Sequence, residues 1–148
     1  MTLINETYRD VFVHGPKNEG TSVAHYLSGL STYRDLEIGA TALGEAMAPE
    51  YRQRFGLHKH STLAEIDAVM GTDAMARFRT FAVVRDPADR VRSIYTFLRR
   101  WPGWTSLDPD YERFRAEFAG FDSVDAFVAS ELFLMPGPDR MFMPQVSW

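Results

Sequence analysis

The chain has 148 residues, of which 45% are hydrophobic and 24% are charged, and these values are typical of a folded globular domain. A disordered chain and a fibrous repeat are therefore excluded, and a chain of this length buries enough surface to form a core. Cysteine is absent, which excludes disulfide bonds, cysteine-ligated metal sites and a thiol nucleophile. The net charge of −4 argues against a nucleic-acid partner, so an anion site requires a local group of Lys and Arg side chains.

The sequence has no segment typical of membrane insertion or secretion. No apolar run approaches the roughly 18 residues that cross a bilayer, and the N-terminal segment lacks the basic and apolar regions of a signal peptide. We therefore expect no membrane span and a cytoplasmic location. The length, together with the absence of repeats and low-complexity tracts, predicts a single domain over residues 1–148.

The first part of the chain predicts strands that alternate with helices. Residues 10–14 form a β-branched and aromatic run that stops at a Gly-Pro pair, which indicates a strand. Apolar residues then recur with a helical period over 21–30, and a weak strand signal covers 33–39. The composition of 40–55 favours a helix that Pro49 interrupts.

The alternation continues further along the chain. Thr62 and Glu65 have the spacing of a capping box, which predicts a helix that ends at Gly71. Residues 80–84 are apolar on both faces, so we expect this strand to be central and buried in the sheet. An Asp-Pro pair at 86–87 then starts a further helix.

The last third of the chain predicts helices. Residues 101–107 are expected to form a loop, and helices are expected from 108 to 118 and from 123 to 132. Strands that alternate with helices indicate an α/β fold. We therefore expect a P-loop-like three-layer domain with a mainly parallel central sheet flanked by helices.

The segment after the first predicted strand has the composition of an anion-binding loop. Gly15 and Gly20 bound the loop and allow its backbone to approach a ligand, and Lys17 supplies a positive charge inside it. Thr21 and Ser22 add hydroxyl donors at the start of the next helix, where backbone N–H groups and the helix dipole attract anions. The spacing is one step from the nucleotide-binding pattern GxxxxGK(S/T), with the lysine moved into the loop. These residues alone leave open a phosphate or sulfate site and an ordinary strand-turn-helix connection.

A second candidate follows the predicted strand at 80–84. Arg85 stands at the carboxyl end of this strand, where open α/β sheets bind ligands, and its planar guanidinium suits a phosphate. Ser93, two helical turns further on, adds a neutral donor. In the alternative structural interpretation, Arg85 pairs with a neighbouring aspartate while two further arginines lie on a solvated face. The residues involved would be Asp86, Asp89, Arg90 and Arg92.

His58 and His60 form a third candidate, between the other two. In an extended segment the two side chains point to the same side, which is compatible with a metal pair, although the sequence places no third ligand. A surface or capping role and general base catalysis are the other interpretations, since a neutral imidazole near pH 7 suits a proton acceptor. We expect no metal.

The two anion-binding candidates together resemble the motifs of the carbohydrate sulfotransferase family, which includes the heparan and chondroitin O-sulfotransferases and many bacterial relatives. The motifs are Pro-Lys-x-x-Gly-Thr-Ser after one strand and Arg-Asp-Pro-x-x-Arg-x-x-Ser-x-Tyr after a later strand. The resemblance covers residues 14–95 and extends to Gln145. It implies an enzyme that uses 3′-phosphoadenosine 5′-phosphosulfate (PAPS) as the sulfuryl donor and releases 3′,5′-adenosine bisphosphate.

The resemblance also implies roles for individual positions. Arg85 and Ser93 would hold the 3′-phosphate of the donor. The 5′-phosphosulfate would be held by Pro16, Lys17, Gly20, Thr21 and Ser22.

A similar His-x-His occurs in heparan 2-O-sulfotransferase relatives, where the histidines are tied to catalysis. By this resemblance, His60 is the expected general base, with His58 supporting or replacing it. Lys17 would stabilise charge on the leaving 5′-phosphate, so the scheme requires no metal. The loop departs from the commonest family pattern at Asn18 and Glu19.

The expected function is therefore transfer of a sulfuryl group to a hydroxyl acceptor, either a carbohydrate or a small molecule. Two alternatives stay open: a P-loop nucleotide kinase or NTPase, and a non-catalytic module that binds an anion or a nucleotide. Trp101 and Trp104 are candidates for stacking on a sugar or an adenine ring.

Members of this family usually continue beyond a Pro-Gln pair, matched here by Pro144-Gln145. We therefore expect either a fragment truncated at its C-terminus or a short member whose site a partner chain completes. The apolar residues 141–143 fit a contact in a homo-oligomer and a truncated core equally well.

Overall fold

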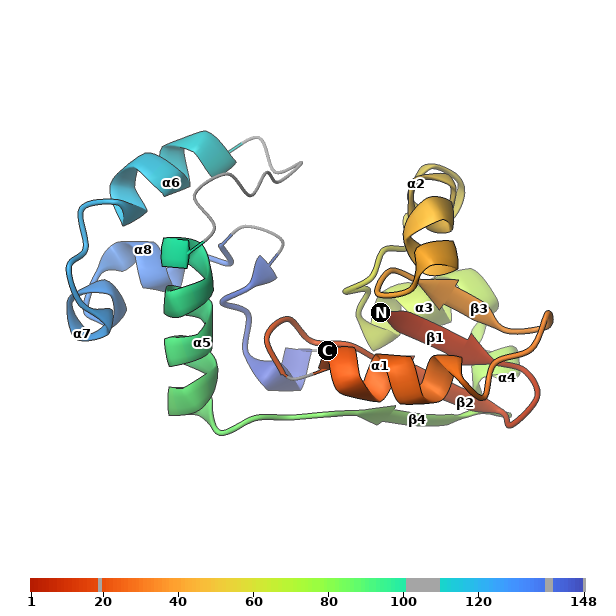
Figure 1. Ribbon diagram of the computed structural model, residues 1–148. Coiled ribbons are helices and arrows are strands. Elements are labelled where there is room, and N and C mark those ends of the chain that lie inside the picture. The colour runs from red at the N-terminus through yellow and green to blue at the C-terminus, as the bar shows by residue number, and fades with distance from the viewer. Residues whose placement is uncertain (19, 101–109, 138–139, 148) are drawn as a thin grey trace. The chain divides into compact units, whose positions relative to one another are not determined.

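The computed structural model describes residues 1–18, 20–100, 110–137 and 140–147. These residues form two compact units, one consisting of Met1–Val84 with the residues from Val146 onward, the other of Arg85–Gln145. The first unit contains the sheet, and the second is helical (Figure 1).

The first unit is built on a four-stranded sheet with the strand order β3-β1-β2-β4. Its strands are β1 Thr2–Asn5, β2 Asp10–Val13, β3 Leu36–Ile38 and β4 Arg79–Ala82. β1 pairs antiparallel with both β2 and β3, and β2 and β4 are the parallel pair. The expectation of a mainly parallel, P-loop-like sheet is therefore wrong.

The antiparallel pairing follows from the short connection between β1 and β2. A hairpin needs only a turn, whereas parallel neighbours need a crossover of about a dozen residues or more, and residues 6–9 are too few for one. The Asn5 side chain helps to close this turn by accepting the N–H of Tyr8 at 2.7 Å. Arg9 completes the turn with a left-handed φ of 59°.

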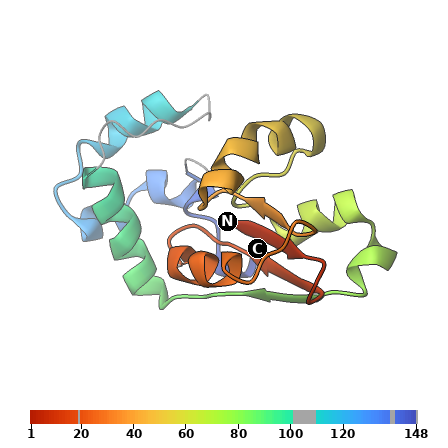
Figure 2. The same cartoon turned by 45° about the vertical axis from the view of Figure 1, so that its right-hand side comes forward.

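Helices cover both faces of the sheet (Figures 1 and 2). They are α1 Gly20–Ser28, α2 Ala42–Phe55, α3 Leu63–Met70 and α4 Thr72–Met75. α1 packs through Ala24 on the face that presents Leu3 and Phe12. Side chains alternate along a strand, so Val11 belongs to the opposite face, where it packs in one cluster with Ile66 of α3.

Three sequence expectations can be compared directly with this unit. The capping box is confirmed, because the Thr62 hydroxyl accepts the N–H of Glu65 at 3.2 Å and the Glu65 carboxylate accepts the N–H of Thr62 at 2.8 Å. α2 continues through Pro49 instead of being interrupted there. β4 lies at an edge of the sheet with all of its residues exposed, so the expectation of a central, buried strand is wrong.

The second unit is a group of helices around an aromatic core. Its helices are α5 Pro87–Arg100, α6 Tyr111–Phe118, α7 Val124–Val128 and α8 Glu131–Leu134. Phe127 is fully buried, and its ring lies 5.1 Å from that of Phe118 and 5.4 Å from that of Phe142 between centroids.

The helix expected at 123–132 is two short helices, α7 and α8. Between them the Ser130 hydroxyl donates to the carbonyl of Phe127 at 2.6 Å, a local bond that competes with helix continuation. A 3₁₀ turn, Gln145–Ser147, ends the described part of the chain. The loop expected at 101–107, with Trp101 and Trp104, lies outside the described residues, as does the expected start of the helix at 108.

Candidate functional site

The predicted anion-binding loop follows β2 directly and leads into α1. Its residues form one continuous connection at the carboxyl end of β2: Pro16 and Lys17 lie in the turn, and Gly20, Thr21 and Ser22 form the first turn of α1. The N–H groups of a first helical turn have no partner within the helix, so they can bind an anion there. The predicted 5′-phosphosulfate residues are therefore brought together.

Lys17 adopts a left-handed backbone conformation, with φ of 60°. This region is unfavourable for residues other than glycine, and such strain often occurs where a loop is shaped for a ligand. Lysine at this position places a cation within the turn, at the cost of backbone strain that glycine would avoid.

Asn18 is a residue that the sequence reasoning did not assign to the site. Its side chain is only 2% exposed, and its Oδ1 atom has no hydrogen-bond partner among the described residues. A buried polar atom without a partner costs roughly 1–3 kcal/mol, so it requires a reason. An acceptor atom does not bind an anion, but it fits a ligand group that brings a hydrogen, such as a hydroxyl. The sequence signal that could have identified Asn18 is that the loop departs from the commonest sulfotransferase pattern at this position.

The predicted histidines lie in a turn. The N–H of Ser61 donates to the carbonyl of His58 at 3.0 Å, which closes a turn over 58–61, so the extended segment assumed for a metal pair is wrong. The Ser61 hydroxyl also accepts the N–H of His58 at 2.8 Å, and the buried Thr2 hydroxyl donates to the His58 carbonyl at 3.1 Å. The sheet thus holds this turn through β1.

His60 is fixed against the start of the anion-binding loop. Its Nδ1 lies 2.8 Å from the backbone carbonyl of His14, the residue directly before Gly15. A carbonyl only accepts, so Nδ1 carries the proton and Nε2 is the basic nitrogen of the neutral ring. Burial is the main cause that holds the pKa of His60 well below its usual range, which keeps the ring neutral.

His58 has the opposite tautomer. Its Nδ1 accepts the backbone N–H of His60 at 3.2 Å, so the proton of the neutral His58 ring lies on Nε2. Of the two predicted histidines, His60 is therefore the one whose Nε2 carries no proton and can accept one. The sequence alone could not make this distinction.

His14 packs beside His60, with ring centroids 4.9 Å apart. Its Nδ1 contacts the amino group of Met1. Burial, and next the charge of that amino group, lowers the pKa of His14 to about 3. His14 is therefore a neutral, structural part of this cluster.

Arg85 and Ser93, the predicted 3′-phosphate residues, lie in the second unit. The Gln145 side chain brackets the Arg85 backbone, because its Oε1 accepts the Arg85 N–H and its Nε2 donates to the Arg85 carbonyl, each at 2.7 Å. Ser93 is partly buried in α5.

The expected solvated arginine face is only partly present. Arg92 is exposed and pairs with Asp89 at 3.2 Å. Arg90 is buried instead, and its guanidinium donates to the carbonyls of Met141 at 2.8 Å and Met143 at 3.1 Å. Arg90 thus joins α5 to the end of the second unit, a role for which the sequence had no signal.

The strands that lead into the two predicted anion-binding motifs are neighbours. β2 and β4 are parallel, with Val13 opposite Ala82, so the carboxyl ends of the two strands lie side by side. Open α/β sheets bind their ligands at the carboxyl ends of parallel strands.

Within the described ranges, no helix has both the length and the apolar character that crossing a membrane requires. Those same ranges contain no group of three or more His, Asp or Glu side chains that could hold a metal ion. The chain matches no protein-family model, no curated protein and no solved structure. The chemistry of the site is therefore the basis for a functional assignment.

Proposed function

We propose that this chain is a PAPS-dependent sulfotransferase, a cytoplasmic enzyme that transfers a sulfuryl group to a hydroxyl of a carbohydrate or small-molecule acceptor. The observation that carries the proposal is the parallel pairing of β2 and β4, the strands that lead into the two anion-binding motifs. The other strand pairs are antiparallel, so the sheet is not a P-loop sheet. The proposal does not require one.

The loop after β2 would bind the end of the donor at which the reaction occurs. PAPS would supply a sulfur–oxygen bond to its 5′-phosphate that is activated for cleavage. Lys17 and the N–H groups that open α1 would stabilise negative charge on the leaving phosphate. Arg85 and Ser93 would bind the 3′-phosphate, as the family resemblance implies.

The turn over 58–61 would supply the general base that accepts the proton of the acceptor hydroxyl. In the balanced reaction, the acceptor oxygen bonds to sulfur, the bond from sulfur to the 5′-phosphate oxygen breaks, and the acceptor hydroxyl loses one proton. His60 would take this proton at Nε2, because its Nδ1 already carries a hydrogen bonded to the His14 carbonyl. His58 supports this arrangement by accepting the backbone N–H of His60.

The Oδ1 of Asn18, which has no partner in the described part of the chain, supports a ligand that carries a hydrogen-bond donor beside the loop. A ribose hydroxyl of the donor and the acceptor hydroxyl both meet this requirement. The nucleotide kinase alternative is less well supported, because such a site needs a lysine directly before Thr21, and Gly20 occupies that position.

Calorimetry tests the proposal without knowledge of the acceptor. The full chain should bind 3′,5′-adenosine bisphosphate more tightly than ATP with magnesium. Lys17→Ala should weaken this binding by about 10- to 100-fold, the range for a lost hydrogen bond to a charged group. Arg54→Ala, at an exposed position of α2 in the same unit, is the control and should leave the affinity unchanged.

A preference for ATP with magnesium would favour the kinase alternative and contradict the proposal. Unchanged affinity in Lys17→Ala would contradict the assignment of the loop. Tight binding of the bisphosphate without sulfuryl transfer from PAPS to any of a panel of sugars, phenols and alcohols would favour a non-catalytic binding module.

A further inference from the structure

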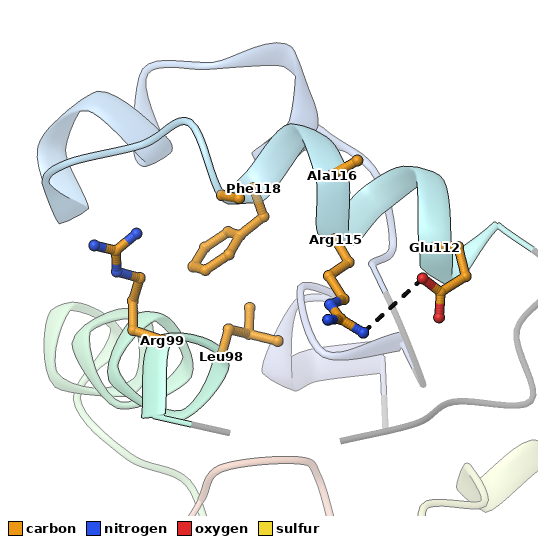
Figure 3. A pocket seen from close by; sticks show the side chains of 7 residues that line it. Leu98, Arg99, Glu112, Arg115, Ala116 and Phe118 are labelled. Carbon is orange, nitrogen blue, oxygen red and sulfur yellow. Dashed lines mark ion pairs between the residues drawn. The ribbon is translucent and has the colours of Figure 1, made fainter. Parts of the chain in front are cut away.

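The second unit contains a hollow that the proposed function does not use. It has a volume of about 390 Å³ and lies between α5 and α6 (Figure 3). Its apolar surface comes from Leu98 of α5 and from the accessible edge of Phe118 of α6, a core residue that is 5% exposed. Ala116 and Ala119 also line it, and these small side chains leave space that larger ones would fill.

Two arginines flank this apolar surface. Figure 3 shows Leu98 and Phe118 between the side chains of Arg99 and Arg115. Glu112 is the acidic lining residue, so the described lining carries one more positive than negative charge. The hollow is therefore locally positive in a chain whose net charge is −4.

Among the described residues, the charge of Arg115 is weakly compensated. Its Nη1 lies 4.0 Å from the carboxylate of Glu112, at the limit of an ion pair, and both side chains are exposed. By contrast, Arg113 on the same helix donates to Glu117 at 2.9 Å, and this carboxylate raises the pKa of Arg113. Exposed pairs with long contacts contribute little, so an oxyanion can replace Glu112 at Arg115 with little loss.

We propose that the hollow between α5 and α6 binds a small molecule with an apolar ring and one oxyanion group, such as an aromatic sulfonate, sulfate ester or carboxylate. The ring would lie on Leu98 and Phe118, and the oxyanion would bind the guanidinium of Arg115. Pockets of this size that combine an apolar lining with a few polar groups are typical of small-ligand sites. The inference is independent of the sulfotransferase proposal, because it uses none of the residues assigned there.

An NMR titration of the full ¹⁵N-labelled chain tests the inference with naphthalene-2-sulfonate as the probe. The expected result is saturable shifts of the backbone amides of Leu98, Ala116 and Ala119. The neutral analogue 2-naphthol should bind at least about fivefold more weakly, because it lacks the charge-assisted bond to Arg115.

Four variants separate this site from a general apolar or cationic surface. Arg115→Gln should weaken sulfonate binding by about fivefold. Arg113→Gln changes an arginine of the same helix that is already paired with Glu117, and it should leave sulfonate binding unchanged. Ala116→Leu fills the hollow at an exposed helical position and should abolish binding while the chain stays folded. Lys17→Ala should have no effect on this binding.

Equal affinity for the sulfonate and 2-naphthol would overturn the inference, because it would show an apolar surface without anion recognition. Equal losses in Arg115→Gln and Arg113→Gln would overturn it as well. The inference also fails if the probe causes no saturable shifts at these amides, whatever the bisphosphate titrations show.

Discussion

The Nδ1 atom of His60 lies 2.8 Å from the backbone carbonyl oxygen of His14, which is the residue directly before the anion-binding loop. This contact joins two segments that are far apart in the sequence, and it determines which nitrogen of His60 holds the proton. It also places the candidate proton acceptor beside the segment that would bind the anionic donor. The catalytic part of the proposal depends on this relationship.

His60 should therefore stay neutral, with its proton on Nδ1, at the pH where an ordinary histidine becomes protonated. Burial is the main cause that lowers the pKa of His60 well below the ordinary value of 6.5. Imidazole ¹⁵N shifts in the full chain would report the tautomer and the protonation state directly. Titration of this ring near pH 6.5, or a proton on Nε2 in the neutral form, would show that the His14 contact is absent in solution.

The buried histidines should make the fold sensitive to acid. The pKa of His14 falls from 6.5 to about 3 on folding, so between these values the unfolded chain binds a proton that the folded chain does not. The free energy of unfolding should therefore decrease as the pH falls below about 6.5, by at most about 1.4 kcal/mol per pH unit from His14.

Urea denaturation at several pH values measures this slope. His14→Gln removes one of the two titrating rings and should make the profile less steep between pH 6.5 and 4. His25→Gln, at an exposed position of α1, should keep the wild-type slope. Identical profiles for the wild-type chain and His14→Gln would refute the assigned role of His14.

Lys17→Gly should raise stability and lower ligand affinity at the same time. Lys17 has a φ of 60°, a region that costs a non-glycine residue about 1–2 kcal/mol, so glycine should increase the free energy of unfolding by up to that amount. The same change removes the ammonium group and should weaken binding of 3′,5′-adenosine bisphosphate. Arg9, with a φ of 59° in the β1–β2 turn, provides the matched control.

Arg9→Gly should give a smaller gain in stability, measured by thermal or urea unfolding, because it also removes the ion pair with Glu6 and the contact with the Phe78 ring. Its affinity for the bisphosphate should be unchanged. If both glycine variants bind the bisphosphate as the wild-type chain does, Lys17 is strained for a reason unrelated to this ligand.

Two glycines with similar backbone angles should differ in their tolerance of alanine. Gly39 has a φ of 80°, and an added Cβ would lie 2.5 Å from the Cβ of Lys59, in the turn that carries the histidines. Gly56 has a φ of 71°, and no atom of the described residues lies within 4 Å of the added atom. Gly56→Ala should cost about 1–2 kcal/mol, and Gly39→Ala should cost about 1–3 kcal/mol more.

The additional cost at Gly39 reflects a clash with the turn over 58–61, so Gly39→Ala should also shift the ring resonances of His60. Equal unfolding free energies for the two variants would contradict the close packing of Gly39 against Lys59.

The helices and the loop after β2 were predictable because their signals are local. The capping box at Thr62 and Glu65, and the periodic apolar residues after Gly20, specify short-range structure directly. Strand pairing is not local, and the sequence analysis missed β1, although two apolar runs flank polar turn residues there. That omission led to the expectation of a parallel sheet.

The same reasoning explains β4. Apolar residues on both faces are typical of a central strand, yet edge or centre depends on which strands pair with it, and the pairing partners of β4 were unknown. The contacts of His60 with His14, and of Arg90 with Met141, join positions separated by 46 and 51 residues. No pattern within a single segment encodes such contacts.

Truncated ligands test most directly whether the two motifs bind opposite ends of one nucleotide. Calorimetry should compare 3′,5′-adenosine bisphosphate with adenosine 5′-monophosphate, which lacks the 3′-phosphate, in the wild-type chain, Lys17→Ala and Arg85→Ala. The account predicts that Lys17→Ala weakens binding of both ligands, whereas Arg85→Ala weakens binding of the bisphosphate alone and makes the two ligands bind alike. If Arg85→Ala leaves the preference for the bisphosphate intact, the two motifs do not share one donor and the central claim is contradicted.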